Sequence, residues 1–151
     1  MTKLILLVED NASDEKLALL AFQRAGVPCE LAVARDGAEA LDYLFATGKY
    51  QDRDPMARPA VVLLDLKLPR ISGLEVLRRI RAAPETRLLP VVILTASRED
   101  EDLIRGYSLG ANAYLRKPVD FAEFSEAAKA LGAFWLRFNE PAPTGRAEPS
   151  R

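Results

Sequence analysis

Residues 61–69 read Val-Val-Leu-Leu-Asp-Leu-Lys-Leu-Pro, an apolar run that ends on the carboxylate of Asp65. Runs rich in Val and Leu and bounded by prolines, here Pro59 and Pro69, are typical of a central strand in a parallel sheet covered on both faces. The carboxyl edge of such a sheet is where ligands bind. Asp65 is therefore either a ligand-binding carboxylate or a surface residue that opens a turn.

The composition indicates one globular domain. The 151 residues are 49% hydrophobic and carry a net charge of -1, which gives no electrostatic attraction to nucleic acid or to an anionic membrane. No segment is apolar enough to span a membrane, and the run at 4–8 is too short for a secretory signal. The single cysteine, Cys29, allows no intrachain disulfide. We therefore expect a protein of the reducing cytoplasm, with no nucleic-acid and no membrane partner.

The chain contains no histidine. This removes zinc sites built on histidine, the Ser-His and Cys-His nucleophile pairs, and histidine acid-base catalysis. Any chemistry has to use carboxylates, hydroxyls and lysine.

Strand and helix patterns alternate five times along the chain. Apolar runs predict strands at 4–8, 31–34, 61–65, 91–94 and 113–115. Between and after them, helices are predicted to begin near Ser13, Asp36, Ser72, Glu99 and Asp120, which are capping or acidic residues. The pattern predicts an α/β fold, a doubly wound five-stranded parallel sheet in the flavodoxin-like order 2-1-3-4-5.

Helical spacing also predicts which side chains face the core. We expect core contacts from Leu17, Leu20 and Ala21 in the first helix and from Leu103, Ile104 and Tyr107 in the fourth. In the last helix one stripe carries Phe124, Ala128, Leu131, Trp135 and Phe138. Phe134 and Leu136 lie off that stripe, so they either meet a partner or are ordinary exposed apolar residues.

Two segments fall outside the alternating pattern. Residues 139–151 hold three prolines and no large apolar side chain, which predicts a disordered tail after a domain at 1–138. Residues 49–59 form a polar loop that is longer than the usual connection of about 2–6 residues. This loop is either an insertion or a contact surface.

Polar side chains stand at the carboxyl ends of four predicted strands. They are Glu9 and Asp10, Asp65, Thr95, and Lys117. Parallel strands end at one edge of the sheet, so these residues should converge beside the switch point. Three carboxylates and one ammonium leave a formal charge of -2, which favours a hard divalent cation with oxygen ligands. Mg²⁺ fits this set, whereas Zn²⁺ does not.

A carboxylate beside Mg²⁺ is a competent nucleophile toward phosphorus, and Asp65 would then form an aspartyl phosphate. Phosphoryl transfer needs mainly positioning and positive charge on the equatorial oxygens. Lys117 and the Thr95 hydroxyl can supply these contacts, and no general base is required.

The same residues resemble a known family. Glu9-Asp10, Leu63-Leu64-Asp65-Leu66-Lys67-Leu68-Pro69, Ser72-Gly73, Leu94-Thr95-Ala96 and Lys117-Pro118 are similar to motifs of the receiver domain of two-component response regulators (CheY-like). The resemblance covers roughly residues 3–138. It implies that Asp65 accepts a phosphoryl group from a phosphohistidine on a partner sensor histidine kinase.

The resemblance also implies roles for single residues. Asp10, Asp65 and the Lys67 backbone carbonyl would bind Mg²⁺ directly, and Glu9 would bind it through water. Lys117 would pair with the phosphoryl group, Thr95 would hydrogen-bond to it, and the Tyr114 rotamer would follow Thr95. The peptide bond that precedes Pro118 is expected to be cis.

A narrower resemblance is to the single-domain response regulators of bacterial phytochromes. It rests on residues 111–115, 117–120 and 134–136 and on the loop at 49–59. It implies that the partner kinase is a bacteriophytochrome and that the last helix and its neighbours form a homodimer. With only a tail predicted after the last helix, we expect no output domain.

Three other interpretations stay open. An aspartate-nucleophile phosphatase would need an acid two residues after Asp65, where this chain has Lys67. A nucleotide or flavin module would need glycines where Glu9, Asp10 and Asn11 stand. The third is a receiver-like scaffold that is never phosphorylated. We expect a phosphoacceptor that catalyses its own phosphorylation and dephosphorylation, not a conventional enzyme.

Overall fold

The computed structural model describes residues 3–118 and 120–143. Its centre is a five-stranded sheet with the order β2-β1-β3-β4-β5, and every neighbouring pair is parallel. The strands are β1 (Lys3–Val8), β2 (Cys29–Ala34), β3 (Val61–Leu64), β4 (Val91–Thr95) and β5 (Ala113–Arg116). The predicted fold class and strand order are therefore confirmed.

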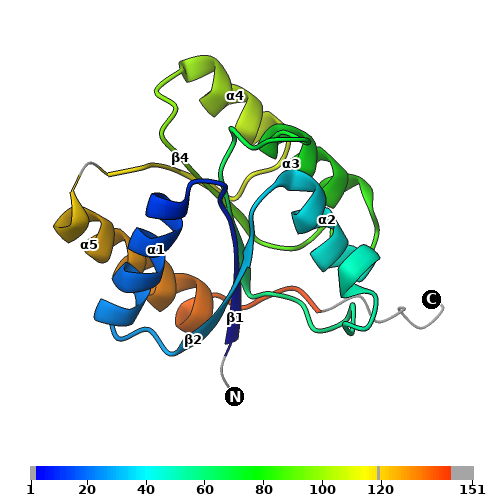
Figure 1. Cartoon of the computed structure of the whole chain (residues 1–151), viewed down its shortest axis with the longest axis horizontal. Helices are drawn as coiled ribbons and strands as arrows, with labels where there is room; N and C mark the ends of the chain where they lie inside the picture. The colour runs from blue at the N-terminus through cyan, green and yellow to red at the C-terminus, as the bar shows by residue number, and fades with distance from the viewer. Residues whose placement is uncertain (1–2, 119, 144–151) are drawn as a thin grey trace.

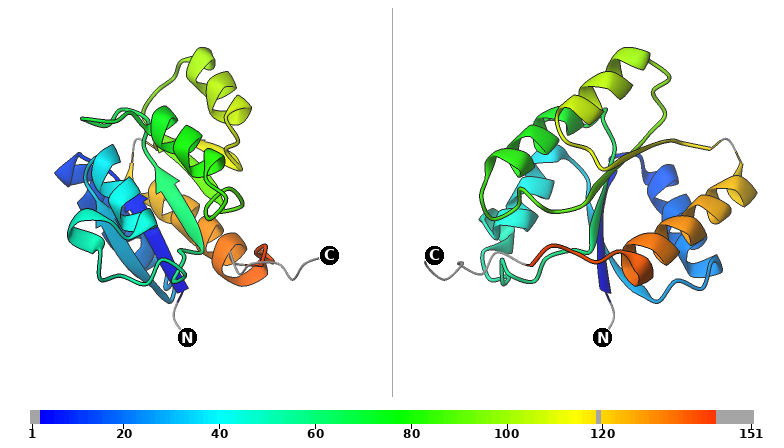
Figure 2. Two further views of the ribbon diagram at one scale, coloured as in Figure 1. Left: turned by 90° about the vertical axis from the view of Figure 1, so that its right-hand side faces the viewer. Right: turned by 180° about the vertical axis from the view of Figure 1, so that it is seen from behind.

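Five helices cover the two faces of this sheet. They are α1 (Ala12–Arg24), α2 (Gly37–Phe45), α3 (Gly73–Ala82), α4 (Asp100–Ser108) and α5 (Phe121–Gly132). Helices α1 and α5 pack side by side on one face, and α2, α3 and α4 lie on the other (Figures 1 and 2). The carboxyl ends of the strands are left open between these two layers.

Alternation along the strands divides the core into two apolar clusters. In β1, Ile5 and Leu7 contact the cluster under α1 and α5, whereas Leu6 and Val8 contact the cluster under α2 and α3. All four residues of β3 are buried. Burial on both faces explains why this strand reads as a continuous apolar run.

The helix starts follow the predicted capping residues, with one exception. Asp36, Ser72 and Asp120 accept backbone N–H groups at the starts of α2, α3 and α5. The N-cap of α1 is Asn11, whose side chain accepts the Asp14 N–H at 2.9 Å, and not Ser13. Asparagine caps a helix as well as serine does, so the helix begins earlier.

The prediction for the buried face of α1 was partly wrong. Ala18, Ala21 and Phe22 are buried, while Leu17 and Leu20 are 37% and 41% exposed. The helix packs against α5, and its buried side carries two alanines and a phenylalanine and does not include the two leucines.

The prediction for α4 was also partly wrong: Leu103 is half-buried, but the other two predicted core residues are not. Ile104 and Tyr107 are 65% and 50% exposed, and Gly106 is the buried residue of this helix. A Cβ on Gly106 would lie 2.7 Å from the Ile93 side chain. Helix α4 thus approaches β4 through a glycine, which turns the apolar residues beside it outward.

The last helix changes its geometry near its end. After α5 the segment η2 (Ala133–Phe138) is π-helical, and the Asn139 N–H donates to the Phe134 carbonyl. Wider turns rotate the following side chains away from the α-helical stripe. Trp135 and Leu136 pack against the core, whereas Phe134 and Phe138 are 50% and 66% exposed. The prediction that Phe138 lies on the buried stripe was wrong, and so was the prediction that Leu136 lies off it.

The loop between α2 and β3 is fastened to α2. It contains the short 3-10 helix η1 (Gly48–Tyr50), and the Tyr50 hydroxyl donates to Glu39 at 2.6 Å. Lys49 pairs with the same carboxylate at 3.1 Å. The loop is thus an ordered extension of this helix face.

Two predictions concern chain ends and membrane contact. Of the predicted tail, residues 139–143 form neither helix nor strand, and residues 144–151 lie outside the described part.

Among the described helices, none is long and apolar enough to cross a membrane.

The expected cis bond before Pro118 is not found. No peptide bond within residues 3–118 is cis. Trans is the isomer that most bonds to proline favour, by about 0.5–1 kcal/mol.

Candidate functional site: an acidic cluster at the carboxyl edge of the sheet

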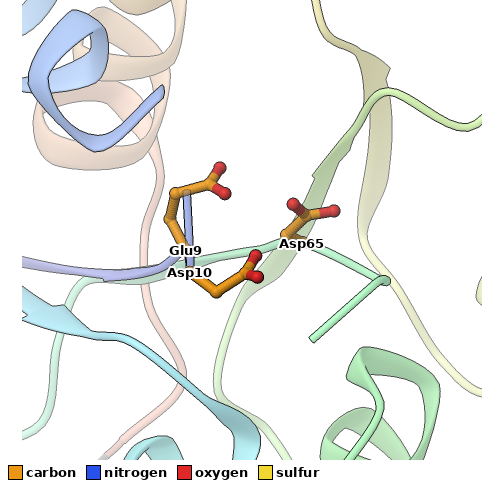
Figure 3. A group of neighbouring side chains, drawn as sticks. All are labelled: Glu9, Asp10 and Asp65. Atoms are coloured by element: carbon orange, nitrogen blue, oxygen red, sulfur yellow. The ribbon is translucent and has the colours of Figure 1, made fainter. Parts of the chain in front are cut away.

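Three carboxylates meet where β1 and β3 end. Val8 pairs with Leu64 in the sheet, so the next residues, Glu9 and Asp65, leave the sheet side by side. Carboxylate oxygens of Glu9, Asp10 and Asp65 lie within 4.8 Å of one another (Figure 3). Glu9 and Asp65 are buried, at 2% and 7% exposure, and Asp10 is exposed. Parallel register therefore produces the predicted convergence.

Lys117 reaches this cluster from the end of β5. Its Nζ lies 2.6 Å from Glu9 Oε1, 3.0 Å from Asp65 Oδ2 and 2.8 Å from Asp14 Oδ2. The lysine side chain is only 11% exposed. These contacts match the three protons of an ammonium group.

Burial and charge shift two ionisation equilibria at the site. Burial raises the pKa of Glu9 to about 7, Lys117 opposes this shift, and Asp65 adds to it. Burial alone would lower the pKa of Lys117, but Asp14, Glu9 and Asp65 outweigh it and hold that pKa above its usual range. Lys117 is therefore charged at neutral pH.

Thr95 is buried at the end of β4, with 1% exposure. Its hydroxyl accepts the Ser97 N–H at 3.3 Å, and its carbonyl accepts the Lys117 N–H at 2.7 Å. Ser97 in turn donates its hydroxyl proton to Asp102 at 2.7 Å. Thr95 thus holds the loop that joins β4 to α4 beside Lys117.

Tyr114 lies on β5 between this loop and α4. Its ring is 6.3 Å from the Tyr107 ring, and the position of Gly106 leaves room for it. The Tyr114 hydroxyl is buried and has no hydrogen-bond partner within the described ranges. Burial raises the pKa of this tyrosine, so its hydroxyl is neutral.

The loop after Asp65 folds back tightly against its own strand. The Lys67 N–H points to Asp65 Oδ1 at 3.4 Å, and the Gly73 N–H donates to the Leu66 carbonyl at 2.9 Å. Arg70 has a φ of 69°, which is costly for a residue other than glycine. The backbone around Asp65 is held by this turn.

We expect Gly73→Ala to destabilise the protein by about 3 kcal/mol or more. A Cβ there would lie 2.1 Å from the Asp65 carbonyl oxygen, so the α3 start and the Asp65 loop would have to separate. Helix propensity would by itself favour alanine by about 1 kcal/mol. Urea unfolding measures the change.

Gly26→Ala is the matched control. Gly26 has a φ of +69° and open space around it, so alanine should cost only backbone strain of about 1–2 kcal/mol. If both variants lost the same free energy of unfolding, the close contact between position 73 and Asp65 would not matter for stability.

Sequence reasoning missed one member of the site. Asp14 was not among the predicted site residues, yet from the first turn of α1 it binds Lys117 across 103 residues of sequence. No local pattern marks such a partner, because the contact exists only once α1 and β5 are placed. The predicted site residues Glu9, Asp10, Asp65 and Lys117 come together, whereas within residues 3–118 no hydrogen bond joins Thr95 to Asp65.

The donor set fits a hard divalent cation and phosphoryl chemistry. Glu9, Asp10 and Asp65 offer carboxylate oxygens to one site, and with Asp14 and the Lys117 ammonium nearby the formal charge is -3 when all are ionised. Such an excess attracts a cation with oxygen ligands. Asp65 and Glu9 both contact Lys117 and both belong to the cluster with Asp10.

The curated relatives of the chain are regulatory proteins. The probable methanogenesis regulatory protein FilR2 of Methanothrix harundinacea is 40% identical over 93% of this chain and 88% of its own length. Response regulator Rcp1 of Synechocystis is 37% identical over 89% of each chain. A structure of Rcp1 in its Mn²⁺-bound form superposes with a TM-score of 0.84.

The solved structures that resemble this chain include response regulators too. The phosphorylated cyanobacterial phytochrome response regulator RcpA has a TM-score of 0.86 and 36% identity, with 95% of this chain and 100% of that chain covered. The bacteriophytochrome response regulator AtBRR has a TM-score of 0.75 and 52% identity, with 93% and 99% covered.

The family model for the response regulator receiver domain matches residues 5–129. Receiver domains are signalling proteins that bind a divalent metal and are phosphorylated on an aspartate by a sensor kinase of a two-component system. The matched residues run from β1 into α5 and include every side chain of the acidic cluster and Lys117. This chain belongs to the response regulator receiver domain family.

Proposed function

We propose that Asp65 is the phosphoacceptor of this receiver and that Lys117 is the cation that pairs with the incoming phosphoryl group. One observation carries the proposal. Asp65 Oδ2 lies 3.0 Å from Lys117 Nζ, within an acidic cluster that can hold a metal ion. A nucleophile and the positive charge needed by the transferring group are therefore already adjacent.

Transfer of the phosphoryl group to Asp65 needs no general base on this chain. A carboxylate oxygen of Asp65 forms a bond to phosphorus while the P–N bond of the partner's phosphohistidine breaks. The electron pair of that bond stays on the imidazole nitrogen of the kinase, which takes up a proton. The result is an acyl phosphate on Asp65 and a free histidine on the kinase.

The metal of this site is proposed to be Mg²⁺. Asp10, Asp65 and the Lys67 carbonyl would hold it directly, with Glu9 acting through water. Mg²⁺ supplies positive charge to the phosphoryl oxygens when bound. The all-oxygen donor set and the Mn²⁺-bound form of the relative Rcp1 support a hard divalent ion.

Thr95 and Tyr114 are the proposed switch residues. Phosphorylation would draw the Thr95 hydroxyl away from the Ser97 N–H and toward the phosphoryl oxygens. Tyr114, whose hydroxyl has no hydrogen-bond partner within the described residues, would then change its position beside α4. Local charge thereby changes the surface formed by α4 and β5.

The proposed partner is a sensor histidine kinase of the bacteriophytochrome type. The names of RcpA, a phytochrome response regulator, and AtBRR, a bacteriophytochrome response regulator, support it. We further propose a cytoplasmic protein of one receiver domain at 1–138, with no nucleic-acid or membrane partner. It would pair as a homodimer through α5 and η2, where Phe134 and Phe138 are exposed.

The test is the intact mass of the protein after incubation with acetyl phosphate, with Mg²⁺ or with EDTA. We expect a gain of one phosphoryl group that requires Mg²⁺, because the three carboxylates repel the donor until a cation neutralises them. No gain under either condition would favour the scaffold that is never phosphorylated.

A further inference from the structure

The contact between Asp14 and Lys117 has no part in the chemistry described so far. Asp14 Oδ2 accepts a hydrogen bond from Lys117 Nζ at 2.8 Å. Among the described residues, the carboxylates close enough to share one metal ion are Glu9, Asp10 and Asp65, and Asp14 is not one of them. Asp14 therefore acts on the lysine alone.

The position of Asp14 is fixed by its helix. Its backbone N–H donates to Asn11 Oδ1 at 2.9 Å, which places Asp14 in the first turn of α1. Its side chain is 34% exposed, compared with 3% for Glu9 and 9% for Asp65. Asp14 is thus the most exposed of the three carboxylates that contact Lys117.

We propose that Asp14 is a positioning residue that holds the Lys117 ammonium beside Asp65 and limits its collapse onto Glu9. This inference rests on the proposed function. Glu9 is the nearest carboxylate to Nζ, at 2.6 Å. Without the pull of Asp14, the lysine would neutralise Glu9 more fully and compete with a cation for that carboxylate.

The geometry explains why one more carboxylate is useful. An ammonium group has three donors, and Glu9, Asp14 and Asp65 occupy all of them. When a phosphoryl group forms on Asp65, its oxygens take over the donor that pointed to Asp65. Asp14 keeps the second contact while a metal ion engages Glu9, so Nζ stays in place during transfer.

The test compares Asp14→Asn with Glu15→Gln. Both substitutions remove one charge from the first turn of α1, but Glu15 pairs with Arg35 at 2.9 Å and not with Lys117. For Asp14→Asn we expect about tenfold slower phosphorylation by acetyl phosphate and, by calorimetry, about threefold weaker Mg²⁺ binding. For Glu15→Gln we expect the phosphorylation rate and the Mg²⁺ affinity to stay within about twofold of the native values.

A double-mutant cycle separates positioning from general charge loss. In a Lys117→Met background, Asp14→Asn should weaken Mg²⁺ binding no more than Glu15→Gln does, because the lysine that it positions is gone. The same threefold loss in that background would overturn the proposal. So would equal behaviour of the two charge variants in the native background.

The results that would contradict the phosphoacceptor role differ from those that would contradict only the positioning role of Asp14. A native protein that binds no Mg²⁺ and gains no phosphoryl group would contradict the phosphoacceptor role itself. A native protein that does both, with an Asp14→Asn variant that matches Glu15→Gln, would contradict only the positioning role. Thermal unfolding of both variants tells whether either substitution changes stability.

Discussion

Asp65→Asn is expected to abolish phosphorylation by acetyl phosphate. An amide oxygen carries no full negative charge and is a poor nucleophile toward phosphorus, so the Asp65 carboxylate has no substitute on the same atom. The neighbours Glu9 and Asp10 are not expected to replace it, because Glu9 is held by Lys117 at 2.6 Å and by the Asn11 N–H at 3.2 Å, and Asp10 makes no ion pair with Lys117 among the described residues. Intact mass over several hours measures the result.

Asp120→Asn is the control for this variant. Asp120 caps α5 by accepting the Glu123 N–H at 2.8 Å, and asparagine caps equally well, so folding should be preserved. We expect the control to gain one phosphoryl group at the native rate. A phosphorylated Asp65→Asn protein would place the acceptor elsewhere, and peptide mapping would then locate it.

Lys117→Met is expected to slow phosphorylation and to strengthen Mg²⁺ binding. A misfolded protein would lose both activities together. Phosphorylation should slow by at least about 100-fold, because the preorganised cation for the phosphoryl oxygens is gone. Mg²⁺ should bind about tenfold more tightly, because the ammonium that lies 2.6 Å from Glu9 no longer repels the metal. Stopped-flow or mass kinetics and calorimetry measure the two changes.

The same substitution should change stability in a metal-dependent way. Removing the cation of a buried cluster leaves Glu9 and Asp65 uncompensated, which costs about 3 kcal/mol or more in EDTA. Mg²⁺ should restore much of this loss through binding to the folded state. Lys129→Met, on the exposed side of α5, is the control and should change neither property. Weaker Mg²⁺ binding by Lys117→Met would argue that the lysine supports the metal site instead of competing with it.

Much of the fold could be predicted because its signals are local or periodic. Apolar runs marked the strands, and capping residues such as Asp36 and Asp120 marked the helix starts. The helix faces were less predictable, because neighbouring elements decide which side is buried. Ile104 and Tyr107 lie outside the core since α4 meets β4 through Gly106, and Phe138 is exposed because η2 departs from α-helical geometry.

The sequence by itself determined the alternation of strands and helices, the absence of histidine chemistry, and the set of polar residues at the strand ends. Those features follow from residue type and spacing along the chain. Only the tertiary structure decided that Asp14 shares Lys117 and that Gly73 must lack a side chain beside Asp65. These depend on atoms far apart in sequence or on backbone geometry, and no local pattern encodes them.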